Sequence, residues 1–200
     1  MAVTMFKHLL ALCVATFLAS CAPIPELGTR LVVGTSTVPL AANSPLRQSV
    51  QVNNVSDDKD THYATSFWFQ TSRLNSAAVM LLPQALEITL SAQGMLAAAG
   101  AQRSLDAVVL EVKEPLGLST TIISTVRYVL TDVATGRVTF DQTIVADYTV
   151  KLGDQPIAYY REPIAFDGSI RNNISKFLDQ LIAMPSDSGS QGEPPGSYRN

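Results

Sequence analysis

The chain has 200 residues, of which 46% are hydrophobic and 16% are charged. This length and composition suit one domain with a real hydrophobic core. The formal net charge is −3, and nucleic-acid binding calls for a clustered basic surface instead. We therefore expect no nucleic-acid partner.

The N-terminus has the pattern of a bacterial lipoprotein signal. Lys7 precedes an apolar run from Leu9 to Leu18, and Leu18-Ala19-Ser20-Cys21 is a lipobox. The run is too short to span a bilayer as a helix. We expect residues 1–20 to be removed and Cys21 to carry a diacylglyceryl group and a further acyl chain such as palmitate, which together give stable anchoring. The alternative is a buried N-terminal helix with an incidental cysteine.

This interpretation also decides the cysteine chemistry. The sequence has two cysteines: Cys13 lies in the segment to be removed, and Cys21 is consumed by lipidation. We therefore expect no free thiol for a disulfide, a nucleophile or a metal site, and no cofactor apart from the covalent lipid.

The rest of the chain divides into three parts. Residues 21–47 are rich in proline and small residues and predict a lipidated N-terminus with an extended tether. Residues 48–184 hold the apolar patterns of a single α+β domain. Residues 185–200 contain almost nothing that could be buried and predict a disordered tail.

The first half of the domain predicts one strand and one helix. Ser49 to Val55 alternates weakly, as a strand does, and a polar loop follows. Helix-like spacing runs from Pro83 to Ala99, with Pro83 suited to the first turn and Gly100 to the end. Within this helix, Gly94 is expected to be unfavourable by about 1 kcal/mol.

The second half predicts three strands and a helix. Apolar residues alternate over 105–112, 122–130 and 138–150, and Gly136 suits a hairpin turn between the last two strands. After Pro163 an apolar stripe with helical period begins. We predict an α+β fold of order β-α-β-β-β-α, with an antiparallel sheet of about four strands and both helices on one of its faces.

Residues suited to catalysis or metal binding are scarce. His62, the one histidine after the signal segment, lies in a polar stretch and predicts a solvated loop. Asp57, Asp58 and Asp60 lack the spacing of a calcium loop. The carboxylate pairs, Glu111 with Glu114 and Asp141 with Asp147, are read as solubilising charges, and neither common phosphate-loop motif occurs. We predict no catalytic residues and no metal.

Aromatic and guanidinium groups supply the candidate contact residues. Trp68, Tyr159, Tyr160 and Arg161 are expected to be exposed, and such side chains dominate protein interfaces. The alternative is that the segment 159–163 is a loop whose tyrosines dock on the sheet edge before the last helix.

The lipobox, the hairpin sequence at residues 128–138 and the closing helix at residues 168–181 carry a resemblance. The chain looks like a group of small proteobacterial lipoproteins of unknown function. In layout it is similar to the YajG-type lipoproteins, the auxiliary lipoproteins of ABC transport systems and the lipopolysaccharide-assembly lipoprotein. A polar insertion near residues 53–65 is a departure, and it leaves the pairing of the first strand open.

The resemblance implies an outer-membrane protein on the periplasmic face that assists a transport or envelope-assembly complex without catalysis. Ala22 fits this destination, because an aspartate there would favour inner-membrane retention in enteric bacteria; without an outer membrane, the cell membrane is expected. A lipid or small-ligand carrier is the alternative, and would need a cavity between helices and sheet. An envelope hydrolase is less favoured.

Overall fold

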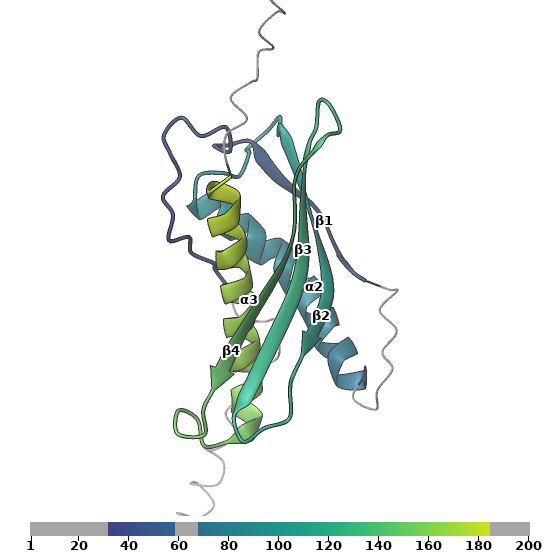
Figure 1. Ribbon diagram of the computed structural model, residues 1–200, viewed down its shortest axis with the longest axis vertical. Coiled ribbons are helices and arrows are strands. Elements are labelled where there is room, and N and C mark those ends of the chain that lie inside the picture. Colours follow the sequence, from purple (N-terminus) through teal and green to yellow (C-terminus); the bar gives the residue numbers. More distant parts are fainter. Residues whose placement is uncertain (1–31, 59–67, 185–200) are drawn as a thin grey trace, which may run out of the picture.

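A computed structural model describes residues 32–58 and 68–184 (Figure 1). Its sheet has the strand order β1-β2-β3-β4. The elements in chain order are β1 (Val50–Asp57), α2 (Trp68–Ala92), β2 (Arg103–Lys113), β3 (Thr120–Asp132), β4 (Val138–Val150) and α3 (Ala158–Ile182). No helix in the described ranges is long and apolar enough to cross a membrane.

The predicted α+β class and element order are confirmed. Figure 1 shows α2 crossing β1 and β2, and α3 running beside β3 and β4. The apolar face of the sheet and the apolar stripes of both helices form one core. Within this core Phe177 stacks on Tyr128 with ring centroids 4.1 Å apart. The opposite face of the sheet carries the polar residues of β3 and β4.

The sheet is mixed, and the prediction of a purely antiparallel sheet is wrong in one strand. β2, β3 and β4 form an antiparallel meander, whereas β1 pairs parallel to β2. The reason is the connection: α2 carries the chain back along the sheet, so β2 starts at the same end as β1.

The helix α2 begins and ends earlier than predicted. Pro83 lies inside it, sixteenth of its 25 residues, and not in its first turn. Side chains spaced three or four apart on both sides of this proline are buried, and this continuous stripe outweighs the one hydrogen bond that proline removes. The buried residues are Leu74, Ala77, Ala78, Leu81, Leu82, Ala85, Leu86 and Leu90.

Gly94, and not Gly100, ends this helix. Gly94 has φ +70°, and its N–H donates to the carbonyl of Ser91 at 3.0 Å, while the N–H of Met95 donates to that of Leu90 at 2.8 Å. This pair of bonds is the Schellman motif, which needs a left-handed residue at the position of Gly94. The glycine predicted to weaken the helix is therefore its C-terminal cap.

The predicted faces hold for β3 and are shifted in β2. Ile122, Val126 and Tyr128 are buried on β3, as expected. In β2 the register shifts between Val109 and Glu111, which is a β-bulge. Because of it, the next buried side chain after Val109 is that of Val112, three residues later and not two. The hairpin between β3 and β4 turns at Gly136, which has the expected positive φ of 69°.

Candidate functional site

The predicted lipidation site lies outside the described residues. Cys21 precedes Val32, where the described chain begins, and lipidation of its thiol stays a prediction. Residues 32–47 were assigned to the tether. They lie against the domain instead, with Val32 and Leu46 buried in its core. The packed body therefore starts at least as early as Val32.

The segment 32–38 is held between the two helices. The N–H of Gly34 donates to Thr89 Oγ1 of α2 at 3.0 Å, and the N–H of Thr35 donates to Ser175 Oγ of α3 at 3.0 Å. A Cβ atom at Gly34 would lie 2.6 Å from the Ile174 methyl group. Only glycine fits so close an approach without a shift of the helix.

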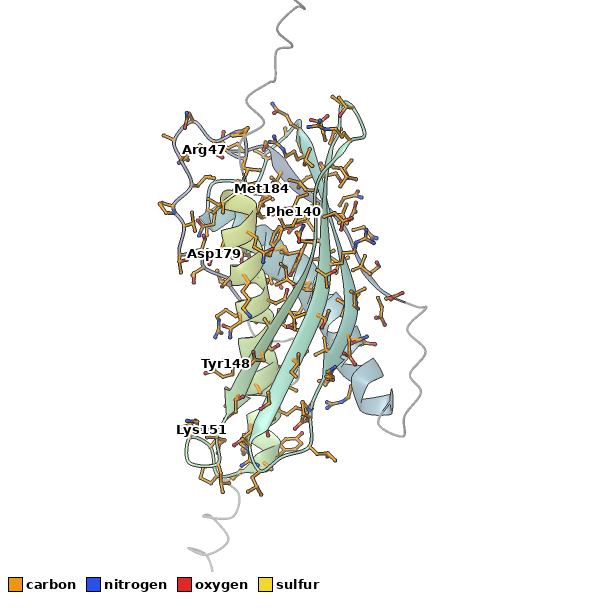
Figure 2. All side chains as sticks on the ribbon, in the orientation of Figure 1. Arg47, Phe140, Tyr148, Lys151, Asp179 and Met184 are labelled. Atoms are coloured by element: carbon orange, nitrogen blue, oxygen red, sulfur yellow. The ribbon has the colours of Figure 1, made fainter. Side chains whose placement is uncertain are left out.

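Asp179 on α3 fixes the end of this segment (Figure 2). Its carboxylate accepts hydrogen bonds from the Ser36 hydroxyl at 2.6 Å, the Thr37 N–H at 2.8 Å and the Thr37 hydroxyl at 3.1 Å. Burial pushes the pKa of Asp179 upward, but the hydrogen bonds from Ser36 and Thr37 outweigh this, and its pKa lies below the usual value. The ionised carboxylate therefore stabilises the docked segment.

The predicted contact residues at 159–161 form the first turn of α3. They are not in a loop before the helix, because α3 already begins at Ala158, and Pro163 lies within it. Pro163 is the sixth residue of this helix, and its missing N–H removes one helical hydrogen bond close to the N-terminus. Tyr159 is 58% exposed, and its ring meets that of Tyr160 edge to face at 5.9 Å.

Arg161 is buried, contrary to the expectation that it is exposed; 7% of its surface is accessible. Its Nε donates to Thr120 Oγ1 at 3.3 Å, and one terminal nitrogen donates to the carbonyls of Gln155 at 3.1 Å and Pro156 at 3.4 Å. Arg161 thus joins the start of α3 to the start of β3 and to the connection after β4. Its buried guanidinium therefore links three segments of the chain at this end of the domain.

Trp68 is the first residue of α2, and its side chain lies outside what the structure describes. Five residues later, Arg73 forms an ion pair with Glu162 of α3. The second turns of the two helices are therefore close enough for their side chains to meet. The structure brings Tyr159, Tyr160 and Arg161 together and places the start of α2 near them.

One member of each predicted carboxylate pair, Asp141 and Glu111, has a basic partner. Asp141 makes a two-pronged contact with Arg127 at 2.8 and 2.6 Å on the open face of the sheet. The hydrogen bond from Arg127 holds the pKa of Asp141 below its usual value. Glu111 pairs with Lys113 at 2.6 Å. Both pairs are largely exposed, so they contribute little to stability.

A buried polar cluster between α3 and the sheet escaped the sequence analysis. Asn173 accepts a hydrogen bond from the Tyr128 hydroxyl at 2.9 Å and donates to the carbonyls of Ser124 and Ile144, each at 3.0 Å. Ser169 donates to the Ser124 hydroxyl at 2.8 Å. Burial raises the pKa of Tyr128. Every buried side-chain polar atom in the described part has a partner, which fits a structural role.

A hollow of about 690 Å³ lies at the other end of the domain, where α3 ends. The segment 38–46, the base of the β3–β4 hairpin and the last turn of α3 form its walls. Arg103, Asp132 and Arg137 line it, together with apolar side chains such as Leu181 and Met184. Arg103 donates to the carbonyl of Pro45. The hollow is not enclosed between helices and sheet, where the carrier alternative requires a cavity.

The remaining sequence candidates add no site. His62 and Asp60 lie outside the described residues. Asp57, at the end of β1, accepts a hydrogen bond from Asn75 at 3.0 Å. Within residues 32–58 and 68–184, no three His, Cys, Asp or Glu side chains are grouped as metal ligands would be.

The sequence matches no protein-family model and no curated protein. Among solved structures, the chain is similar to a Xanthomonas campestris protein of family DUF330, with 11% identity and a TM-score of 0.51 over 76% of this chain and 90% of that one. A minor lipoprotein from Acinetobacter baumannii matches at 15% identity and a TM-score of 0.39, over 69% and 92%. PelC from Paraburkholderia phytofirmans matches at 19% and 0.41, over 72% and 93%. The first likeness shows a shared fold.

Proposed function

We propose that this chain is a lipid-anchored protein of the cell envelope that acts by contact and without catalysis. The lipobox Leu18-Ala19-Ser20-Cys21, at the end of a signal-like apolar run, is the observation that carries the proposal. Two acyl chains on one cysteine give stable membrane attachment, whereas one chain does not.

The packing of residues 32–38 limits how far the domain can lie from this anchor. Ten residues, 22–31, separate Cys21 from Val32, and fully extended they would reach about 36–40 Å. Because Val32 is already in the core, the slack between lipid and domain is limited to this length. The domain therefore stays within about one domain diameter of the bilayer.

The finer role we propose is that of an accessory to a transport or envelope-assembly complex in the outer membrane, facing the periplasm. Its support is the layout resemblance and the exposed tyrosine at 159, a residue type enriched in binding hot spots. Because Arg161 is buried, it is not one of the proposed contact residues. Those residues are Trp68, Tyr159 and Tyr160.

Metabolic labelling with a palmitate analogue tests the anchor. The wild-type chain should take up the label and fractionate with the outer membrane, and Cys21→Ala should do neither. Cys13→Ala is the matched control and should label like the wild type. Equal labelling of Cys21→Ala would reject the anchor, and the mature form in the inner membrane would reject the destination. Crosslinking from intact membranes, compared between wild type and Tyr159→Ala, tests the contact role.

A second candidate is a different kind of small-ligand carrier, one that uses the open hollow beside the end of α3 and not a cavity between helices and sheet. The volume of this hollow lies within the usual range for ligand sites, and its walls combine apolar side chains with two arginines. A single-chain amphiphile with an acidic head suits such a lining. Oleate should then raise the melting temperature of the wild type and raise that of Arg137→Ala less. Equal shifts in the two chains would reject this candidate.

A further inference from the structure

Large apolar side chains are exposed at the end of the domain where α3 begins. Of ten such side chains in the described part, four lie on the β2–β3 and β4–α3 connections. Leu116 and Leu118 are 85% and 88% exposed, more than the other eight. The set, which we call the apolar tip, is Leu116, Leu118, Leu152 and Ile157.

The two connections lie side by side on a fixed base. Thr120 pairs with Val150 in the sheet, so the β2–β3 connection ends where the β4–α3 connection begins. Arg161 donates to both sides of this junction, to Thr120 and to the carbonyls of Gln155 and Pro156. Figure 1 shows both connections at the end where α3 starts. The apolar tip is thus one surface and not a scatter of single side chains.

The N-terminal segment points toward this same end. From Gly34 beside Ile174 to Thr37 beside Asp179, the segment advances in the direction of α3. Traced backward from Thr37 to Gly34, the described chain therefore runs in the direction of Ala158. That end lies about 24 Å from Ile174 along the helix, and residues 22–31 can reach about 36–40 Å. The chain is long enough to place Cys21 level with the apolar tip.

Charges around the tip are mixed in sign. Lys113 and Lys151 flank the two connections, and Glu114 and Asp154 lie on them; Figure 2 shows Lys151 at this end. This balance does not select for strongly anionic lipids. The side chains of the tip are leucine and isoleucine, which favour the acyl region. A largely zwitterionic bilayer matches this chemistry.

We infer that the apolar tip docks on the lipid bilayer in which Cys21 is anchored. The inference rests on the proposed lipid anchor and adds an orientation. Leu116 and Leu118 enter the interface, α3 rises from the membrane, and the β3–β4 hairpin and the hollow face away from it. The tip fixes the orientation of the tethered domain, because the loops contact the bilayer in addition to the lipid on Cys21.

Depth-dependent quenching tests this orientation on the full lipidated chain. Leu118→Cys is labelled with the fluorophore NBD and placed in vesicles of phosphatidylcholine and phosphatidylethanolamine containing a doxyl-labelled phosphatidylcholine. Val133→Cys, exposed on the hairpin at the opposite end, is the matched control. The label at 118 should emit at shorter wavelength and lose most of its fluorescence to the doxyl group, and the label at 133 should do neither.

Three outcomes would overturn the inference, and they are distinguishable. Chains that float with the vesicles but leave the label at 118 in water reject the docked tip and keep the anchor. A label that is shielded but not quenched by doxyl lipid shows that protein covers the tip. Chains that do not float lack the anchor, and both proposals then fail.

A second variant separates docking from mere proximity. With the label moved to Leu152→Cys, the additional changes Leu116→Asn and Leu118→Asn should abolish most of the quenching. Val133→Asn with Val138→Asn, also exposed, should leave it unchanged. Because all four positions are exposed, unchanged melting temperatures are expected. Full quenching in the Leu116→Asn, Leu118→Asn chain would contradict docking through these leucines.

Discussion

The carboxylate of Asp179 accepts a hydrogen bond of 2.6 Å from the hydroxyl of Ser36, although 143 positions of sequence separate the two residues. Thr37 adds its N–H and its hydroxyl to the same carboxylate. This junction converts a proline-rich stretch, which would otherwise be free, into part of the folded domain. It depends on a titratable group, and so it is open to test by pH.

Asp179→Asn should lower the free energy of unfolding by about 1–2 kcal/mol at pH 7. Since the pKa of Asp179 is lowered in the fold, its contribution is present above the pKa of the unfolded chain, near 4, and is lost as the pH falls through the folded value. The difference between wild type and variant should therefore shrink below about pH 4. Urea unfolding from pH 7 to pH 3 measures it, and a constant difference would contradict the role of the charge.

Amide hydrogen exchange gives a local readout for the same variant. The N–H groups of Thr35 and Thr37 should exchange faster in Asp179→Asn, whereas those of β3 should not change. Arg171→Ala, at an exposed position on the same helix, serves as the control.

Replacement of Phe177 should be the costly change in a test of the two sheet faces. Phe177 is fully buried and stacks on Tyr128, so Phe177→Ala should lose about 3–5 kcal/mol. Asp141→Ala, on the open face, removes one exposed ion pair and should cost far less than Phe177→Ala. Thermal melts compare them, and a larger loss in Asp141→Ala would reverse the assignment of the faces.

Arg161→Ala should destabilise the domain by about 1–3 kcal/mol. The loss leaves the carbonyls of Gln155 and Pro156 without their donor and removes a buried side-chain stem. Tyr159→Ala, two residues earlier and exposed, should change stability by less than about 0.5 kcal/mol. Similar melting temperatures for Arg161→Ala and the wild type would show that the guanidinium does not support this end.

Asn173→Leu should cost about 3 kcal/mol or more, because the Tyr128 hydroxyl and the carbonyls of Ser124 and Ile144 each lose a buried hydrogen-bond partner. Tyr128→Phe alone removes one hydrogen bond and should cost about 1 kcal/mol. The double variant should then be more stable than the sum of the two losses predicts. Additive losses in urea titrations would mean that the two side chains are not coupled.

Local sequence patterns predicted those elements whose apolar spacing follows the period of a strand or a helix. The alternation in β3 and β4 and the stripe from Ile170 to Leu181 predicted those elements, because one side of each faces the core. Both helices begin earlier than predicted, and a proline is the reason in each case. Pro83 was expected in the first turn of its helix and Pro163 just before its helix, yet tertiary packing holds each proline inside a helix.

The features missed by the sequence analysis depend on partners far away in the chain. Nothing near Arg161 in the sequence shows that carbonyls at 155 and 156 and a hydroxyl at 120 surround it. The parallel pairing of β1 depends on where α2 delivers the chain. Likewise, Ser36 and Thr37 look like tether residues until α3 supplies a carboxylate.

The docked segment 32–38 also decides how the domain responds to force. Tension applied along the chain from its N-terminal side reaches the hydrogen bonds at Gly34, Thr35 and Thr37 before it reaches the strand at Val50. These hydrogen bonds are few, and each contributes only about 0.5–1.5 kcal/mol, so the segment is held less firmly than the sheet and the helices. The segment therefore detaches first under tension. Its release adds more than a dozen residues to the tether and leaves the sheet and the helices intact.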